Sequence, residues 1–350
     1  MNIVMVMHYF WPRGGGEERH GRLLGRELVA RGHDVTFVVA AYDPSLPEHD
    51  EIDGIAVHRI SDEHTRNLGF AHRWSWFRRH RELLDGADVV HCHDPITVTR
   101  WYLLERHLRR ELPVYMTVHG YEGYPVPRSA KVERAVACRQ VRKVISVADL
   151  RCFYPGSRVD RVIYGATALP PDAGRPLLAP ERYLAFIGRL APGHNPVGVV
   201  EAVAEWRRLG GDPPPLLLFG DGPLEGATRA AISRTGVEAR LMGRTLEPER
   251  WMRHAEAAFC GGYLSLLEAL AAGVHAYCLD NDPVLAECWR QIPVDGFVHS
   301  PGPRRLGDLL AADEQDPQGA AARTARGREW ARTQTWSRMA DLYEEVWELR

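Results

Sequence analysis

The sequence lacks the features that mark disulfide-bonded, membrane-spanning and nucleic-acid-binding proteins. Its six cysteines form no C-x-x-C pair, which is typical of reduced thiols in a cytosolic protein rather than of a disulfide framework or a zinc site. No run of about 18 consecutive apolar residues occurs, so no segment is expected to span a membrane. The formal net charge is only −2, so no strong overall field favours nucleic acid as a partner.

The first apolar segment also lacks the signature of a signal peptide. "NIVMVMHYFW" (2–11) has no basic n-region and is followed by Pro12, so we expect a first strand there and a cytoplasmic protein. Hydrophobic residues make up 45% of the chain and charged residues 26%, as in soluble globular proteins. The length of 350 residues favours two domains.

What the sequence does contain is a repeated alternation of strands and helices. A strand, a glycine-rich turn, an amphipathic helix and a second strand follow one another over residues 2–41, which is the pattern of a βαβ unit. Further buried strands are predicted at 87–94, 112–120 and 142–147, and a second series of strands at 182–190, 214–223 and 239–244. This alternation predicts an α/β fold with parallel sheets that helices cover on both faces.

The domain boundaries are expected where the pattern stops. Residues 168–181 are rich in proline and glycine, so they are expected to link a domain of residues 1–167 to one of residues 182–327. Residues 328–350 include a helical spacing of apolar side chains, and this helix is expected to pack back towards the first domain. Two domains that face each other would leave a cleft at the carboxyl ends of both sheets, where ligands of open α/β sheets bind.

Glycine-rich segments follow two of the strands. Gly15 and Gly16 precede the first helix, where glycine lets the backbone approach a phosphate and free N–H groups favour one; a tight turn is the alternative. The later segment "FGDGPLEG" (219–226) does not have the G-x-G-x-x-G spacing of a dinucleotide site, which disfavours a nicotinamide enzyme.

Histidines end two neighbouring strands of the first half. His91 and His93 share one face of a strand that runs into Asp94, and His119 ends the next strand. These residues could hold a metal ion, or they could form a set of hydrogen-bonded strand-end histidines. His119 could also donate a hydrogen bond to a substrate hydroxyl.

In the second half, Arg189 directly follows a buried strand. A guanidinium in this place can grip a diphosphate, or it can simply lie on the surface. The stretch "FCGGYLSLLEALAAG" (259–273) predicts a helix whose first free amides lie near residues 262–264, which makes a second anion site. Glu268 lies within that helix, either placed to accept the two hydroxyls of a ribose or on an exposed stripe.

Taken in order, these segments resemble the retaining glycosyltransferases of family 4, which have the GT-B fold of two Rossmann-like domains with parallel sheets facing across an interdomain cleft. The resemblance spans nearly the whole chain and is carried by "GGGEERH…LVARGHDVT", "ADVVHCHDP", "TVHG", "FIGRL", "LLLFGDGPL", "LMGR" and "LLEALAAG". It implies a hexosyltransferase-type reaction without metal or cofactor. A sugar would pass from a UDP- or GDP-sugar to a hydroxyl acceptor with retention at the anomeric carbon.

The resemblance also implies roles for individual residues. The catalytic residues would be His119 near the donor sugar, Arg189 at the leaving diphosphate, and His194. The residues expected to bind the donor are Gly15, Gly16, Gly188, Gly243, Arg244, Gly262, Tyr263, Leu264 and Glu268. The residues expected on the acceptor side are His20, His93 and Asp94.

The chain departs from the family pattern at two positions of the donor site. Cys260 stands where the family has the first acid of its E-x7-E element, and His194 stands where it has a lysine. His194 could replace that lysine at a phosphate only if it is protonated. Both changes weaken the subsites for the donor sugar and the diphosphate, and they are consistent with a different donor or with lost activity.

Three other functions and one further partner stay open. A GT-B protein could catalyse epimerisation or a pseudo-glycosyltransferase coupling, or it could bind nucleotide sugars without turnover. A metal-dependent hydrolase could use His91, His93, Asp94 and His119. Residues 70–84 interleave aromatic and basic side chains, which would suit peripheral contact with an anionic membrane or an ordinary helix with its aromatics in the core. The acceptor could be a saccharide, a lipid-linked sugar or a small molecule.

Overall fold

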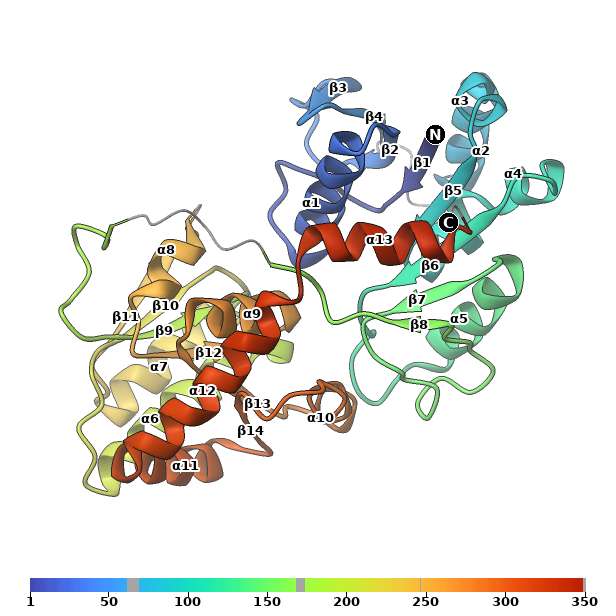
Figure 1. Ribbon diagram of the computed structural model, residues 1–350. Helices are drawn as coiled ribbons and strands as arrows, with labels where there is room; N and C mark the ends of the chain where they lie inside the picture. Colours follow the sequence, from blue (N-terminus) through green and yellow to red (C-terminus); the bar gives the residue numbers. More distant parts are fainter. Residues whose placement is uncertain (62–68, 168–173, 246, 349–350) are drawn as a thin grey trace. The chain divides into compact units, whose positions relative to one another are not determined.

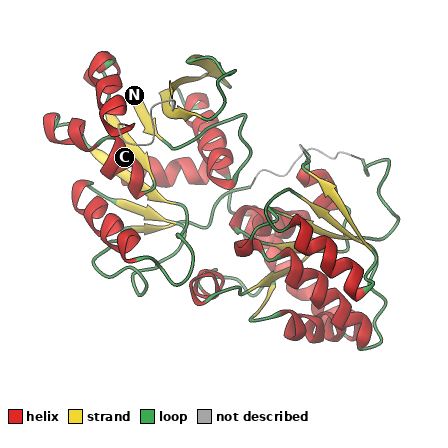
Figure 2. Cartoon of the chain, turned by 180° about the vertical axis from the view of Figure 1, so that it is seen from behind, coloured by secondary structure: helices red, strands yellow, loops and turns green. Residues whose placement is uncertain are grey.

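The computed structural model describes residues 1–61, 69–167, 174–245 and 247–348 (Figure 1). The chain divides into two compact units that are treated separately below. Each unit has a parallel sheet with helices on both faces (Figure 2), so the α/β fold expected from the sequence is confirmed.

The units do not have the boundaries expected from the sequence. Unit 1 comprises residues 1–163 and 336–350, and unit 2 comprises residues 164–335. The second unit thus begins at Tyr164 rather than at 182, because residues 164–167 pack within it. The segment that joins unit 1 at the C-terminus begins at Trp336 rather than at 328. Of the expected linker, residues 168–173 lie outside the described part of the chain.

Unit 1 contains a sheet with the strand order β3-β4-β2-β1-β5-β6-β7-β8. Neighbouring strands are parallel, except that β3 pairs antiparallel with β4. The strands are β1 (Asn2–Val6), β2 (Asp34–Ala41), β3 (His49–Ile52), β4 (Ile55–Ser61), β5 (Val89–His93), β6 (Val114–Val118), β7 (Val144–Ser146) and β8 (Arg161–Val162). The chain reverses the order of strand addition between β1 and β5, which makes the carboxyl ends of this pair a topological switch point.

Helices cover both faces of this sheet. On one face lie α1 (Gly16–Ala30) and α13 (Trp336–Val346), and α1 packs closely because Gly21 and Gly25 contact Met7, Phe37 and Ile55. The helices of the other face are α2 (Gly69–Arg79), α3 (Arg81–Asp85), the π-helix η1 (Thr97–Trp101), α4 (Leu103–Leu108) and α5 (Arg128–Gln140).

The alternation of side chains along β5 explains where the histidines go. Val90 and Cys92 point into the apolar core beneath α2 to α5. Because successive side chains of a strand point to opposite faces, His91 and His93 lie beneath α1 and α13. Both are fully buried, so each requires hydrogen-bond partners on that face.

Unit 2 contains a sheet with the strand order β11-β10-β9-β12-β13-β14, and its neighbouring strands are all parallel. The strands are β9 (Leu184–Ile187), β10 (Leu216–Phe219), β11 (Ala239–Gly243), β12 (Ala257–Cys260), β13 (His275–Leu279) and β14 (Val298–Ser300). Counted from β9, this is the 3-2-1-4-5-6 order of dinucleotide-binding sheets. Its topological switch point lies between β9 and β12.

The helices of unit 2 also form two layers. An apolar core joins α6, α7 and α11 to one face of the sheet, and α8, α9 and α12 pack together on the other. The helices are the 3-10 turn η2 (Pro192–His194), α6 (Pro196–Arg208), α7 (Glu225–Thr235), α8 (Pro248–Arg253), α9 (Tyr263–Ala272), α10 (Pro283–Arg290), α11 (Pro303–Gln315) and α12 (Pro317–Arg332).

The aromatic and basic segment 70–84 folds as α2 and α3. Trp76 and Phe77 are buried in the core, and Trp76 stacks on His80 with ring centroids 4.1 Å apart. Arg73 is also buried, with its guanidinium 4.3 Å above the Trp101 ring. These aromatic side chains therefore serve the core of unit 1. Among the described helices, none has the length and apolarity that a membrane crossing requires.

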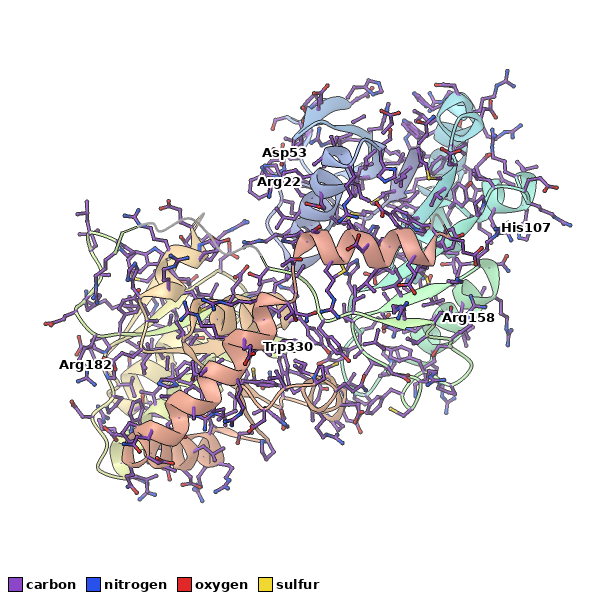
Figure 3. The ribbon with its side chains drawn as sticks, viewed as in Figure 1. Arg22, Asp53, His107, Arg158, Arg182 and Trp330 are labelled. Carbon is purple, nitrogen blue, oxygen red and sulfur yellow. The ribbon has the colours of Figure 1, made fainter. Side chains whose placement is uncertain are left out.

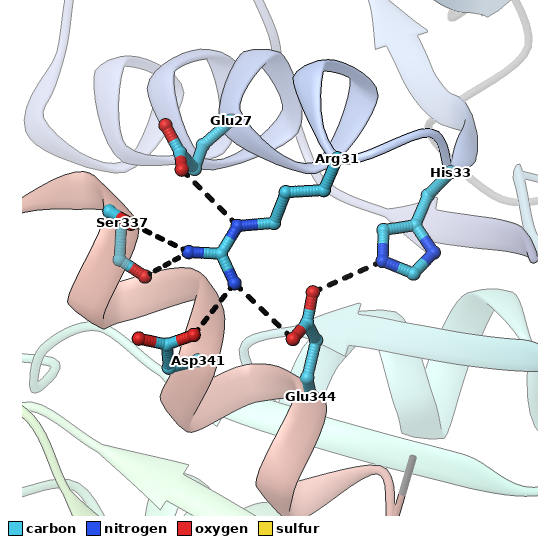
Figure 4. A network of polar contacts seen from close by, with 6 residues as sticks. All are labelled: Glu27, Arg31, His33, Ser337, Asp341 and Glu344. Carbon is cyan, nitrogen blue, oxygen red and sulfur yellow. Dashed lines mark hydrogen bonds and ion pairs between the residues drawn. The ribbon is translucent and has the colours of Figure 1, made fainter. Parts of the chain in front are cut away.

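The C-terminal helix α13 is attached to α1 by a network around Arg31 (Figure 4). The Arg31 guanidinium lies 2.8 Å from an Asp341 oxygen and 3.2 Å from a Glu344 oxygen, and it donates to the Ser337 hydroxyl at 2.8 Å. His33 contacts the other Glu344 oxygen at 3.1 Å. Since Glu344 is nearly inaccessible, its charge depends on these partners.

We predict that Arg31→Met destabilises unit 1 by about 2 kcal/mol, because it leaves the buried Glu344 carboxylate with one partner fewer. Amide hydrogen exchange over residues 336–346 should accelerate. Arg208→Met is the matched control, since Arg208 pairs with Glu205 on an exposed surface and should change little. Equal effects of the two substitutions would contradict the role of Arg31.

Candidate functional site

At the switch point of unit 2, two loops leave the sheet side by side. Cys260 is paired with Ile187 at the carboxyl ends of β12 and β9. Gly188 and Arg189 therefore emerge next to Gly261 and Gly262, which lead into α9. Site residues were predicted from the sequence in both loops, and the register of the strands brings the two loops to the same edge of the sheet.

The N-terminus of α9 presents free backbone donors at this edge. The Ser265 hydroxyl accepts from the Gly262 amide at 3.3 Å and donates to the Gly262 carbonyl oxygen at 2.9 Å. The amides of Tyr263 and Leu264 belong to the first turn, where N–H groups have no intrahelical acceptor. Together with the helix dipole, they form a site that favours an anion.

The side chains of Tyr263 and Leu264 point elsewhere. The Tyr263 hydroxyl donates to the Cys288 carbonyl oxygen at 3.2 Å, and its ring packs against Trp289. Leu264 lies against Gly165. Any contribution of these two residues to a ligand site therefore comes from their amides. Burial raises the pKa of the Tyr263 hydroxyl well above its ordinary value, so it stays protonated.

Arg189 is an exposed cation beside these amides. Its guanidinium forms no hydrogen bond or ion pair with the residues that the structure describes. By contrast, the guanidinium of Arg182, at the amino end of the same strand (Figure 3), pairs with Glu256 at 2.7 Å. An arginine without an internal partner is available to a ligand anion.

His194 is held against glycine backbone. A Cβ added at Gly188 would lie 3.1 Å from its Nδ1, and one added at Gly261 would lie 2.8 Å from its Cγ. Nδ1 is buried and has no hydrogen-bond partner among the described residues. Burial, and then the charge of Arg189, lower the pKa of His194 to about 4. The imidazole is therefore neutral at pH 7 in the unliganded protein, which does not fit the expectation of a cation in place of the family lysine.

The G-D-G segment after β10 (220–222) passes close to the backbone of residues 188–190. A Cβ at Gly220 would overlap the Gly188 carbonyl oxygen, and one at Gly222 would lie 2.5 Å from the Leu190 carbonyl oxygen. Both glycines have positive φ, at 138° and 149°. They hold the loop that carries Arg189 in place, which is a structural reason for this glycine pattern.

Gly243 and Arg244 end the neighbouring strand β11. Gly243 has φ of 72°, and its carbonyl oxygen accepts from the Gly220 amide at 2.8 Å. The exposed Arg244 lies 3.9 Å from Asp221, a loose surface pair that a ligand could replace. The open space beside Gly243 suits the backbone contact expected of it.

The side chains of Glu268 and Cys260 differ in their exposure to solvent. Glu268 is partly exposed on α9, one turn beyond Leu264. Cys260 is buried, and its thiol lies beside that of Cys278 on the neighbouring strand. The position where the family has an acid therefore faces the interior of unit 2.

Asn281, at the end of β13, is a site residue that the sequence reasoning missed. Its Nδ2 donates to the Gly193 carbonyl oxygen at 2.9 Å, so it fixes the turn that carries His194. Its Oδ1 is buried and has no partner among the described residues. The signal that could have found it is its place directly after a buried strand, which it shares with Arg189.

In unit 1, the start of α1 is acidic. A Cβ at Gly15 would overlap the Glu18 carboxyl group, and Arg13 pairs with Glu18 at 3.7 Å. A phosphate that approached Gly15 or Gly16 would meet this carboxylate. The Glu18 side chain thus occupies the place in which the sequence predicted a donor phosphate.

Glu17 and Asp94 place two partly buried carboxyl groups near each other at the switch point of this unit. Burial first, and then the charge of Asp94, raise the pKa of Glu17 well above its ordinary value. Burial also raises the pKa of Asp94, although its Oδ1 accepts from the His119 amide at 2.8 Å. Oε1 of Glu17 is buried without a partner among the described residues.

A buried hydrogen-bond chain runs from α13 to α1. The Trp347 indole N–H, which can only donate, lies 3.0 Å from His91 Nδ1. His91 Nε2 must then carry a proton, which it donates to the Thr117 hydroxyl at 2.8 Å. The Thr117 hydroxyl contacts the Tyr343 hydroxyl at 2.8 Å, and Tyr343 shares a hydrogen bond with His20 Nε2 at 3.0 Å.

His93 and His119 form a second pair, with 2.7 Å between His93 Nδ1 and His119 Nε2. Burial lowers the pKa of His20, His91 and His93 well below the ordinary value and that of His119 to about 4. His20 and His93 are buried, so the direct acceptor contacts expected of them are blocked in this structure. Over the described residues, no group of three or more His, Cys, Asp or Glu side chains is arranged to hold a metal ion.

Known proteins resemble the chain in part of its sequence and in its fold. Residues 14–150 match the family described as Glycosyltransferase Family 4. No curated protein sequence matches the chain significantly.

Among solved structures, the chain is similar to sucrose-phosphate synthase from Thermosynechococcus elongatus (14% identity, TM-score 0.72) and to Anabaena HepE in complex with UDP and glucose (13%, 0.75), with 100% of each chain covered. It is also similar to WaaG, a glycosyltransferase involved in lipopolysaccharide biosynthesis (15%, 0.69), with 98% of this chain and 99% of that one covered. These likenesses confirm the expected GT-B fold.

We predict that Glu17→Gln stabilises unit 1 at neutral pH, because the folded state pays a desolvation cost for a carboxylate that the amide does not carry. A raised folded pKa means that the wild type loses stability as the pH rises from 4.5 through the folded value. The difference in Tm should therefore be small near pH 4 and larger near pH 7. The exposed Glu225→Gln is the control, and a lower Tm for Glu17→Gln at pH 7 would contradict the assignment.

We predict that Gly261→Ala destabilises unit 2 by roughly 1 to 3 kcal/mol, because its methyl group overlaps the His194 ring. Gly262→Ala, with extended backbone and no atom within 4 Å of the new Cβ, should be tolerated. In the double variant Gly261→Ala with His194→Ala, most of the loss should be recovered in chemical denaturation. A loss that persists in the double variant would show that His194 does not fill this space.

Proposed function

We propose that this chain, whose residues 14–150 match Glycosyltransferase Family 4, is a retaining, metal-independent glycosyltransferase of that family. It transfers a sugar from a nucleotide diphosphate sugar, UDP- or GDP-linked, to a hydroxyl acceptor, and it needs no cofactor. The observation that carries the proposal is the edge of unit 2, where the exposed Arg189 lies beside the free first-turn amides of α9.

The donor diphosphate binds at this edge in our proposal. The amides of Tyr263 and Leu264 and the Arg189 guanidinium supply donors for phosphate oxygens, whereas the Gly262 amide already donates to the Ser265 hydroxyl. Glu268, further along α9, accepts from the ribose hydroxyls. Gly243 leaves room for the nucleoside beside the backbone of β11, and Arg244 lies next to it. The space beside Gly188 is taken by the His194 ring.

UDP-sugars are the first donors to test. HepE, which shares the fold at 13% identity, has been solved with UDP and with UDP-glucose. Recognition of the base would rest on backbone groups near Gly243. Because backbone groups are the same in most residues, the side chains here do not indicate which base is bound.

The chemistry proposed is substitution with retention at the anomeric carbon. The acceptor hydroxyl attacks from the face from which the diphosphate departs, and a phosphate oxygen of the leaving group takes the acceptor proton. Arg189 and the amides of α9 stabilise the charge that develops on the diphosphate. His194 is neutral before the donor binds, so it contributes a hydrogen bond rather than a full charge.

Unit 1 supplies the acceptor groups in this proposal. Asp94 and His119 lie at the carboxyl ends of β5 and β6, and Glu17 lies above them in α1. Two carboxyl groups would repel a phosphate, so they favour an acceptor that is neutral where it binds, such as a saccharide or polyol. Peripheral contact with an anionic membrane through residues 70–84 would rest on exposed residues such as Arg78, Arg79 and Phe70, because Trp76 and Phe77 are buried.

Donor binding is tested by thermal shift with UDP, GDP, ADP and their sugar conjugates in excess chelator. One nucleotide should raise the Tm of the wild type, and Glu268→Ala should lose that shift while the exposed Glu225→Ala keeps it. A shift that appears only when metal is restored would contradict the metal-independent proposal. Binding without any turnover would favour a silent nucleotide-sugar-binding module, and a changed nucleotide sugar without transfer would favour an epimerase.

The role of Arg189 is tested by turnover with the stabilising donor. Arg189→Ala should lower kcat by about a hundredfold, as expected when a group that stabilises a developing anion is lost. Arg182→Ala, at the opposite end of β9, is the matched control and should keep its activity (Figure 3). Unimpaired kcat in Arg189→Ala would count decisively against the mechanism.

A further inference from the structure

The hydrogen bond between His93 and His119 joins a fully buried imidazole to one that is partly exposed. The two rings are nearly coplanar, with 8° between their planes, which suits an in-plane N–H···N bond. Only one of the two facing nitrogens can carry the proton. The choice fixes which nitrogen of His119 is left to face a ligand.

The surroundings of His93 decide this choice. Its other nitrogen, Nε2, is buried and has no partner among the described residues. If His119 Nε2 were the donor, neutral His93 would carry its own proton on Nε2 and would bury an unpaired N–H group. If His93 Nδ1 is the donor, Nε2 is only an unpaired acceptor. Orphaned buried N–H groups are rarer than orphaned acceptors, so the second arrangement is favoured.

If the His93–His119 pair carried an additional proton, both nitrogens of one ring would be protonated. The surroundings of the pair disfavour this positive charge. Burial is the first cause that lowers the pKa of both histidines, and the neighbouring imidazoles of His91 and His20 lower that of His93 further. The ring centroid of His20 lies 4.8 Å from that of His119, and His20 Nε2 is already hydrogen-bonded to the Tyr343 hydroxyl. The acidic neighbour on this edge, Asp94, contacts the His119 amide rather than its ring.

We propose that His93 is a positioning residue that holds His119 in the Nδ1–H tautomer, so that His119 presents a hydrogen-bond donor to its substrate. His119 would then recognise a lone pair, such as that of a sugar hydroxyl oxygen, and would not act as a base. The statement about the tautomer stands on the structure of unit 1 alone. Only the identity of the substrate rests on the proposed function.

The tautomer is measured directly by long-range 1H–15N NMR of the histidine rings near pH 7, with His119 assigned from the loss of its signals in His119→Asn. The wild type should show a protonated Nδ1 and an unprotonated Nε2 in His119. A protonated Nε2 in the wild-type spectrum would overturn the proposal. This readout needs no substrate, so it is independent of whether the protein transfers sugars.

Variants of His93 test whether this residue sets the tautomer. His93→Asn keeps a donor where Nδ1 was, so it should keep the Nδ1–H form of His119 and hold kcat/KM within about threefold of the wild type. His93→Leu, which removes the donor without adding a charge, should give a mixture of tautomers and a roughly tenfold lower kcat/KM with the stabilising donor. An unchanged Nδ1–H form in His93→Leu would show that His93 does not control it.

Discussion

The pairing of parallel strands at two switch points is the constraint on which both candidate sites depend. In unit 2 the β9–β12 register sets Gly188 and Arg189 beside Gly261 and Gly262. In unit 1 the sheet order brings the carboxyl ends of β5 and β6 together, and with them Asp94 and His119. Because all strands at these points run in the same direction, unpaired loop backbone and helix N-termini collect at one edge.

The two departures from the family pattern are both accommodated inside unit 2. Cys260 turns its thiol towards Cys278, and His194 fills the space that Gly188 and Gly261 leave open. Neither side chain offers a charge to a donor, so Arg189 and the α9 amides are left as the main anion-binding groups. In the proposed function, this arrangement would keep the groups for the nucleotide and would leave fewer polar side chains for the donor sugar.

Sequence patterns predicted the features that depend on short-range order. The strands β1, β2, β5 to β7 and β9 to β11, the start of α9 and the position of Arg189 follow from periodicity and from their place after apolar runs, whereas β3, β4, β8 and β12 to β14 were not predicted. The patterns could not predict the inward turn of His194, the Asn281 contact with Gly193 or the Arg31 network with α13, because these join residues far apart in the chain. The aromatic residues of α2 were ambiguous for the same reason, since only the packing of unit 1 shows that Trp76 and Phe77 are buried whereas Phe70 is exposed.

The most direct test of the account is hydrogen–deuterium exchange of the whole chain with and without a UDP- or GDP-sugar in excess chelator. The account predicts protection of the amides in residues 188–194 and 261–264 when the right donor is added. Protection confined to other segments, or none until a metal ion is supplied, would contradict a metal-independent donor site at this edge of unit 2.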